Sequence, residues 1–237
     1  SSPGQTIGVS VFTDFLIREL DLSRTLLSLA YLVGTVGSAL LLSQAGRLYD
    51  FFGGRLVATV AAVVLALVLI GLTMTPAIAG YFGGPAVAFV VISVGFFLLR
   101  FSGQGMLTLG SRNMVMEWFD ERRGLANAVM GVSISFGFSY APRFFDDLIQ
   151  SFGWQGAWRA VAAAVALFAL LAFLFYRDTP EAHGFQPDGP LRGRIKKTHA
   201  EAMSGRPFTL PEARRTYAFW VFALTLFMAG LVVTAYT

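Results

Sequence analysis

The sequence FFLLRFSGQGMLTL places an arginine inside a long apolar segment. Arg100 follows Ala86 by about 14 residues, so a helix rising about 1.5 Å per residue would carry it roughly 21 Å from the segment's start. A guanidinium near the centre of a bilayer costs at least ~2.5–3.5 kcal/mol, so it should face a cavity or a partner. Its planar fork can bind a carboxylate bidentately. Arg100 is therefore either part of an anion site or a structural arginine, satisfied by helix carbonyls or by a carboxylate from elsewhere in the protein.

The stretch GRLYDFFGGR, residues 46–55, holds three charges between two apolar segments. Its simplest interpretation is a tight turn, because Gly53 and Gly54 tolerate positive φ. A carboxylate at Asp50 could also accept charge-assisted hydrogen bonds, or approach a helix N-terminus, in one conformation and lose those contacts in another. A contact that exists in only one conformation can act as a gate.

Two further charged clusters have both a structural and a functional interpretation. Arg122 and Arg123, in WFDERRG, are either interfacial anchors or part of the same gate. In APRFFDDL, Arg143 and its two following aspartates have the i,i+3/i+4 spacing of side-chain pairs on a helix. We interpret that set as an interfacial charge cluster, with contact to an outer vestibule as the alternative.

Other chemistries lack the residues they need. The sequence has no cysteine, and its two histidines, His183 and His199, lie in one polar stretch, so we expect no metal and no cofactor. No phosphate loop, Ser-His-Asp set or pair of catalytic carboxylates stands out, which argues against an enzyme. The basic residues lie between apolar segments rather than along one face, which argues against nucleic-acid binding.

The composition indicates a membrane protein. Hydrophobic residues make up 55% of the 237 positions and charged residues only 14%, and the mean hydropathy is +0.64. A membrane-spanning helix needs about 20 apolar residues. By that rule the chain has seven segments: 3–17, 26–45, 56–74, 86–118, 124–148, 158–176 and 217–237. The first is too short to span and the last stops at Thr237, so we expect both ends to be truncated.

The connections between segments orient the chain. Most are short and turn-like, including TPAIAGYFGGP, but residues 177–215 form a long polar linker with eight Lys/Arg. Of the 18 Lys/Arg, 13 lie in this linker or around the gaps after the second and fourth segments. Lys and Arg are in excess in cytoplasmic loops. Residues 46–55, 117–124 and 177–215 are therefore predicted to be cytoplasmic.

The pattern Gly46-x-x-x-Asp50-x-x-Gly53-x-Arg55 resembles the loop between helices two and three of the major facilitator superfamily, G-x-x-x-D-R-x-G-R-R. Phe51 stands where that loop has a basic residue. The block WFDERRGLANAVMGVSISFG is similar to the start of helix five in monocarboxylate transporters and the oxalate:formate antiporter group. Its small residues either let another helix approach closely or only fill space in the helix packing. They are Ala126, Ala128, Gly131, Ser135 and Gly137.

The resemblance implies an all-α polytopic membrane protein: the six-helix N-terminal half-bundle of a twelve-helix major facilitator fold. Residues 1–176 would form that bundle, 177–215 the linker and 216–237 the start of helix seven. It also implies a C-terminal six-helix half, a bacterial inner membrane location with lipid around the helices, and a secondary transporter moving a small, monocarboxylate-like organic anion, possibly with a proton. The gating residues it implies are Gly46, Asp50, Gly53, Arg55, Arg122 and Arg123.

Candidate substrate contacts follow from depth as well as from resemblance. Facilitator carriers often place an arginine before a Gln-Gly pair in helix four; Arg100, Gln104 and Gly105 resemble that with one extra residue of spacing. Gln5, Thr6 and Ser133 lie at a similar predicted depth. We expect Arg100, Gln104, Gln5, Thr6 and Ser133 to line the cavity, although Ser and Thr also bond to their own helix carbonyls.

Three alternative functions would each need other features in the sequence. A carrier for a non-anionic solute, drug-like or sugar-like, would use Arg100 structurally or for proton coupling. A seven-helix receptor would not explain the linker, and a retinal protein would need a lysine in the last helix, whereas Lys196 and Lys197 both lie in the linker. An intramembrane enzyme would need catalytic groups at depth. The leading hypothesis is alternating-access transport.

Overall fold

The computed structural model describes residues 3–180, together with 187, 212, 214–217, 219–221, 223–225 and 228; side chains are described from Val11 onward. The chain divides into two compact units, Ser1–Pro190 and Leu191–Thr237. Described positions between 217 and 228 are helical. Most of the predicted linker and seventh segment lies outside the described residues.

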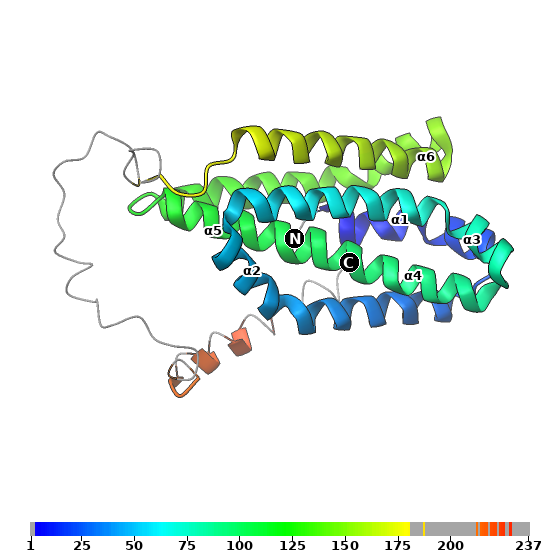
Figure 1. Ribbon diagram of the computed structural model, residues 1–237, viewed down its shortest axis with the longest axis horizontal. Coiled ribbons are helices and arrows are strands. Elements are labelled where there is room, and N and C mark those ends of the chain that lie inside the picture. The colour runs from blue at the N-terminus through cyan, green and yellow to red at the C-terminus, as the bar shows by residue number, and fades with distance from the viewer. Residues whose placement is uncertain are drawn as a thin grey trace. The chain divides into compact units, whose positions relative to one another are not determined.

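The first unit is built from helices (Figure 1). Their bounds are α1 Pro3–Leu20, α2 Arg24–Thr73, α3 Thr75–Phe82, α4 Pro85–Leu99, the π-helix η1 Arg100–Leu107, α5 Thr108–Trp118 and α6 Arg123–Phe175. No strand occurs among the described residues. Among the described residues, three helical stretches are long and apolar enough to cross a membrane: Arg24–Thr73, Pro85–Trp118 and Arg123–Phe175. The all-α membrane fold expected from the sequence is confirmed.

Two of these stretches are each broken by one glycine into two arms. In α2, Gly53 has φ 80° and ψ 164°, and in α6, Gly153 has φ 69° and ψ 169°. The chain turns back at each break, so the two arms of each stretch run in opposite directions (Figure 1). The arms 24–52 and 54–73 contain the predicted second and third segments, and 123–152 and 154–175 the fifth and sixth. The prediction of a Gly53-Gly54 turn was only partly right, since helix continues through Phe52 and Gly54 does not have positive φ.

The predicted turn TPAIAGYFGGP is wrong, because its first eight residues form α3. Pro76 is tolerated there because a proline in the first helical turn removes no intrahelical hydrogen bond. The turn itself is confined to Gly83 and Gly84, both with positive φ. The apolar residues of this stretch are therefore helical, and the chain reverses direction only at Gly83 and Gly84.

The packing of α4 between the arms of α2 positions the candidate site. A Cβ on Gly34 would lie 2.7 Å from the backbone nitrogen of Phe97, so the first arm touches the α4 backbone directly. A Cβ on Gly95 would lie 2.4 Å from Leu72 Cδ2 on the second arm. The most buried large side chains include Phe12, Leu16, Ile92 and Phe96. This close contact holds the residues after α4 against the first arm of α2.

Within the described residues, the small residues Ala128, Gly131 and Ser135 of the fifth segment do not approach another helix closely, and the close approach predicted for them stays a prediction. Around a Cβ built on Gly131 no atom of the described residues lies within 4 Å, and Ala128 and Ser135 are exposed. Gly34 and Gly95 make the close approaches instead. The sequence shows that these residues are small, but it does not show which helix they pack against.

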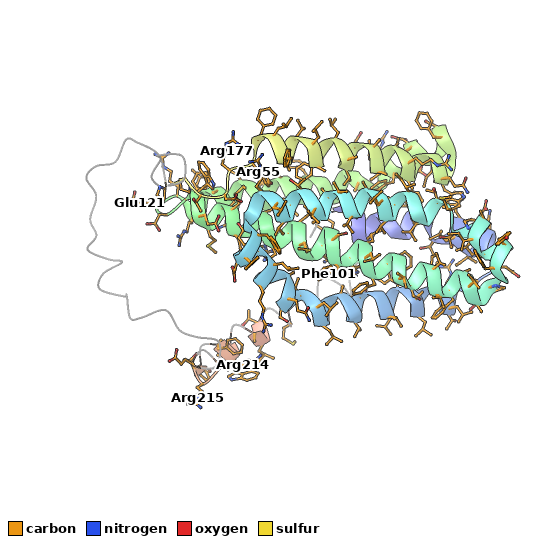
Figure 2. The ribbon with its side chains drawn as sticks, viewed as in Figure 1. Arg55, Phe101, Glu121, Arg177, Arg214 and Arg215 are labelled. Carbon is orange, nitrogen blue, oxygen red and sulfur yellow. The ribbon has the colours of Figure 1, made fainter. Side chains whose placement is uncertain are left out.

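Two of the stretches predicted to be cytoplasmic, residues 46–55 and 117–124, lie with the first residues of the third, Arg177 and Asp178, at one end of the bundle, which we call the motif end. Arg55 contacts Phe173 and Asp178, and Trp118 contacts Arg177. Figure 2 shows Arg55, Glu121 and Arg177 together at this end. At the opposite end, Trp154 Nε1 donates to Glu19 Oε1 at 3.4 Å.

Candidate functional site

The residues after α4 form a π-helix rather than a continuation of the α-helix. The π-helix η1 runs Arg100–Leu107 and contains the whole RFSGQG sequence. A π-helix pairs residues i and i+5, so each turn accommodates about one more residue than an α-helix, and such segments are frequent at functional sites. The extra residue between Arg100 and the Gln104-Gly105 pair, relative to the family pattern, lies within this wider turn.

Neutral groups hold the Arg100 side chain. Its Nε donates to Thr35 Oγ1 at 3.0 Å, its Nη1 donates to Gln104 Oε1, and its guanidinium carbon lies 4.6 Å from the centre of the Tyr31 ring. The Thr35 hydroxyl donates in turn to the Tyr31 carbonyl at 2.7 Å. We call Tyr31, Thr35, Arg100 and Gln104 the arginine cluster. These partners fix the direction of the guanidinium without neutralising its charge.

Neither of the two ion pairs found among the described residues involves Arg100; they are Arg24–Asp14 and Arg123–Asp120. Nη2 of Arg100 takes part in none of the hydrogen bonds described for this side chain. The Tyr31 hydroxyl is buried and has no hydrogen-bond partner among the described residues. The cluster therefore combines a positive charge with donor groups that the described part of the chain does not use, which is the chemistry that binds an anion.

The other predicted cavity residues are not joined to this cluster. Ser133 is exposed on α6 and donates to the Val129 carbonyl at 2.9 Å, the local bonding that serine readily adopts in helices. Gln5 and Thr6 lie in α1, but their side chains fall outside the described residues. The structure thus brings together Arg100 and Gln104, and adds Tyr31 and Thr35, which the sequence analysis missed. No signal in the sequence marked those two, because they come from another helix.

At the motif end, Arg55 and Gly53 contact the segment that follows α6. The Asp178 carboxylate accepts a hydrogen bond from the Arg55 backbone N–H at 2.7 Å. Arg55 Nε donates to the Phe173 carbonyl at 2.7 Å, and its guanidinium lies 4.7 Å from the Phe173 ring centre. A Cβ on Gly53 would lie 2.8 Å from Asp178 Oδ1, so this position requires glycine for space as well as for φ. Asp178 therefore caps the start of the second α2 arm.

The remaining residues of the motif differ in exposure. Asp50 is exposed, and no ion pair involves it among the described residues. Gly46 lies beside open space, because a Cβ atom placed on it would meet no neighbouring helix or side chain of the described residues within 4 Å. Tyr49, between them, is 5% exposed and its hydroxyl donates to the Glu117 carboxylate at 3.2 Å. Tyr49 and Glu117 thus join the first arm of α2 to the end of α5, a contact that the motif pattern did not predict.

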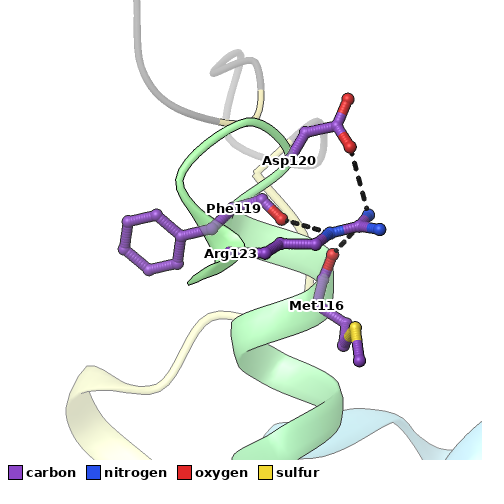
Figure 3. Close-up of polar contacts among 4 residues, drawn as sticks. All are labelled: Met116, Phe119, Asp120 and Arg123. Carbon is purple, nitrogen blue, oxygen red and sulfur yellow. Dashed lines mark hydrogen bonds and ion pairs between the residues drawn. The ribbon is translucent and has the colours of Figure 1, made fainter. Parts of the chain in front are cut away.

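Arg123 closes the end of α5. Its Nε donates to the Phe119 carbonyl at 2.6 Å, its Nη2 donates to the Met116 carbonyl at 3.0 Å, and Asp120 lies 3.4 Å away (Figure 3). A cation near the last carbonyls of a helix interacts favourably with the helix dipole. Arg122 is exposed beside it. Arg123 thus caps the end of α5, and both interpretations of the arginine pair, interfacial anchor and gate, stay predictions.

Comparison with known protein families supports a membrane-spanning fold. A search of curated proteins found no match. The family model described as Major Facilitator Superfamily matches residues 4–237. This match covers nearly the whole chain. It agrees with three helical stretches that can cross a membrane and with the glycine-aspartate-arginine motif, which is formed by Gly46, Asp50, Gly53 and Arg55. The chain therefore belongs to the major facilitator superfamily, a family of secondary transporters in the membrane.

Proposed function

We propose that this protein transports a small organic anion, such as a monocarboxylate, by alternating access, and that Arg100 binds the substrate carboxylate. The observation that carries the proposal is the arginine cluster, where a guanidinium deep in a spanning segment has only neutral partners among the described residues. A buried charge without a counter-charge is costly. A carboxylate would supply the counter-charge and charge-assisted hydrogen bonds together.

The cluster would orient the substrate. Thr35 holds Nε and Gln104 holds Nη1, so the Nη2 edge of the guanidinium is the edge left to meet a carboxylate. The Tyr31 ring covers the guanidinium at 4.6 Å and limits its movement. A donor set that is fixed before binding loses little entropy when the anion arrives.

Transport also requires a second half. In this superfamily's alternating access, two halves rock around a site near the middle of the membrane. We expect a C-terminal six-helix half to supply further contacts to the anion, and the motif end to face the cytoplasm of a bacterial inner membrane. An arginine bonded to neutral partners also fits a carrier for a non-anionic solute, and substrate tests with the full-length protein separate the two.

The decisive variant is Arg100→Gln in the full-length protein. Loss of a buried charged partner costs about 2–5 kcal/mol, so binding of a transported carboxylate should weaken by roughly 30-fold or more. Uptake of a labelled monocarboxylate into proteoliposomes should be abolished, while membrane insertion and yield stay unchanged. Arg159→Gln, at an exposed arginine on α6, is the matched control and should transport normally.

Competition by related solutes tests whether the substrate must carry a negative charge. Monocarboxylates should compete for uptake, whereas their neutral methyl esters and amides should not. Arg100→Lys keeps the charge but loses the planar fork, so it should recover only part of the affinity. Normal carboxylate uptake by Arg100→Gln would remove Arg100 from the substrate site, and equal competition by the esters would favour a non-anionic solute.

A further inference from the structure

A hollow lies at the motif end, between the end of α5 and the end of α6. Its volume is about 310 Å³, and we call it the α5–α6 groove. Met114, Val115 and Phe119 line it from the α5 side, and Phe175 lines it from α6. Trp118, Tyr176 and Arg177 complete its lining. It belongs neither to the arginine cluster nor to the glycine-aspartate-arginine motif.

The polar rim of the groove is held in place. Trp118 Nε1 donates to the Arg177 carbonyl at 3.2 Å, which joins the two sides. The Tyr176 backbone N–H donates to the Ala172 carbonyl at 2.9 Å and closes the last turn of α6. The Tyr176 phenol is protonated at neutral pH, as tyrosine ordinarily is, and can donate a hydrogen bond.

The charge at the rim belongs to Arg177. Its side chain is exposed, and its hydrogen bonds are two long ones from Nη1, to the carbonyls of Leu174 at 3.3 Å and Tyr176 at 3.4 Å. No ion pair involves it among the described residues. The carboxylate next in sequence, Asp178, is bonded to the Arg55 backbone. Most of the Arg177 guanidinium is thus available to an anion at the mouth of an apolar groove.

The position of the groove selects the kind of anion. Leu171, Leu174 and Phe175 are exposed apolar residues on the last turns of α6, and Phe175, at 72% exposure, also lines the groove. In a membrane protein such a surface faces lipid tails, whereas Trp and Tyr gather at the headgroup level. The groove therefore lies where an apolar chain from the bilayer and a phosphate at the interface can be bound together.

We propose that the α5–α6 groove binds one anionic phospholipid of the leaflet at the motif end, with an acyl chain between α5 and α6 and the headgroup phosphate at Arg177. Basic positions between helices at this level suit anionic headgroups. The proposal does not depend on which solute is transported.

Native mass spectrometry of the purified full-length protein measures lipid retention directly, with added phosphatidylglycerol or phosphatidylcholine. One arginine near an anionic surface contributes about 1 kcal/mol, so Arg177→Gln should weaken phosphatidylglycerol binding about fivefold. Arg177→Lys and the control Arg159→Gln should retain it. Phosphatidylcholine binding should change little in any of the three. Unchanged phosphatidylglycerol binding by Arg177→Gln would refute the site.

A second variant tests the acyl chain. Val115→Phe narrows the groove without changing charge, so binding of both lipids should fall, with an unchanged melting temperature showing that the fold is intact. Glycerol phosphate, which has the headgroup chemistry but no tail, should not displace phosphatidylglycerol. Displacement by glycerol phosphate, or undiminished binding by a folded Val115→Phe variant, would show that the groove does not hold a lipid tail.

Discussion

At the residue scale, the acidic and basic members of the glycine-aspartate-arginine motif have different surroundings. Arg55 is bonded within this half of the fold, to Phe173 and through its backbone to Asp178. Asp50 is exposed on the same turn of chain. The resemblance assigns both to a cytoplasmic gate, and the geometry makes Asp50 the member that is free to contact another part of the protein. The gating role of both residues stays a prediction.

Asp178 and Asp50 should therefore respond differently to removal of the carboxylate. Asp178→Ala loses a helix cap and should lower the free energy of unfolding by about 1–2 kcal/mol, because the Arg55 N–H loses its acceptor. Asp50→Asn should leave it within about 0.5 kcal/mol, as surface substitutions usually do. Denaturant unfolding in detergent measures both. Equal losses in the two variants would contradict the capping role.

The candidate site shows which residue contacts a sequence can predict. Arg100 and Gln104 are four residues apart on one helix, so their pairing could be expected from spacing alone. Tyr31 and Thr35 were missed because they lie about 65 residues away, on an arm that meets η1 only after packing. Asp178 was missed for the same reason, since its contact with Arg55 spans 123 positions.

At the element scale, apolar length predicted the spanning segments well, because lipid requires every backbone group to be paired within a helix. The local departures were not predictable in the same way. Whether residues 100–107 pair as i,i+4 or i,i+5 changes no apolar pattern, so hydropathy does not predict the π-helix. The one extra residue between Arg100 and the Gln104-Gly105 pair is its only trace in the sequence. The sequence of α3 predicts a turn because Pro76, Gly80 and the following Gly83 and Gly84 are also turn residues.

The contact between the first α2 arm and α4 should be sensitive to one methyl group. Gly34→Ala would put a Cβ 2.7 Å from the Phe97 backbone nitrogen, and we expect a destabilisation of about 1–3 kcal/mol from overpacking. Gly71→Ala, where nothing lies within 4 Å, should instead stabilise by about 0.5–1 kcal/mol. Denaturant unfolding should separate the pair. A neutral Gly34→Ala would contradict the close approach.

At the scale of the whole molecule, residues 46–55, residues 117–124 and the first residues of the predicted linker, Arg177 and Asp178, come together at one end of the bundle. Trp118 contacts Arg177, and Arg55 contacts Phe173, so loops distant in sequence share one face. The orientation rule depended only on the distribution of Lys and Arg, and it grouped the same stretches. The membrane side of that face is a prediction that labelling can test.

The 237 residues contain no cysteine, so single introduced cysteines report the side of the membrane cleanly. Arg122→Cys at the motif end and Ser151→Cys beside Gly153 are both at exposed positions. In intact cells a membrane-impermeant maleimide should label Ser151→Cys and not Arg122→Cys. Inverted vesicles should give the opposite result. Labelling of Arg122→Cys in intact cells would reverse the proposed orientation.

The two glycine breaks have a consequence for the ancestry of this chain. Each follows a phenylalanine, Phe52 or Phe152, and their φ and ψ values differ by only 11° and 5° (80° and 69°; 164° and 169°). Each joins the second and third spanning helices of a three-helix set, and they lie at opposite ends of the bundle. Such a pair is what duplication of a three-helix unit, inserted the second time upside down, would leave behind. A conformational change that uses the joint at Gly53 on one side of the membrane would then have an inherited counterpart at Gly153 on the other.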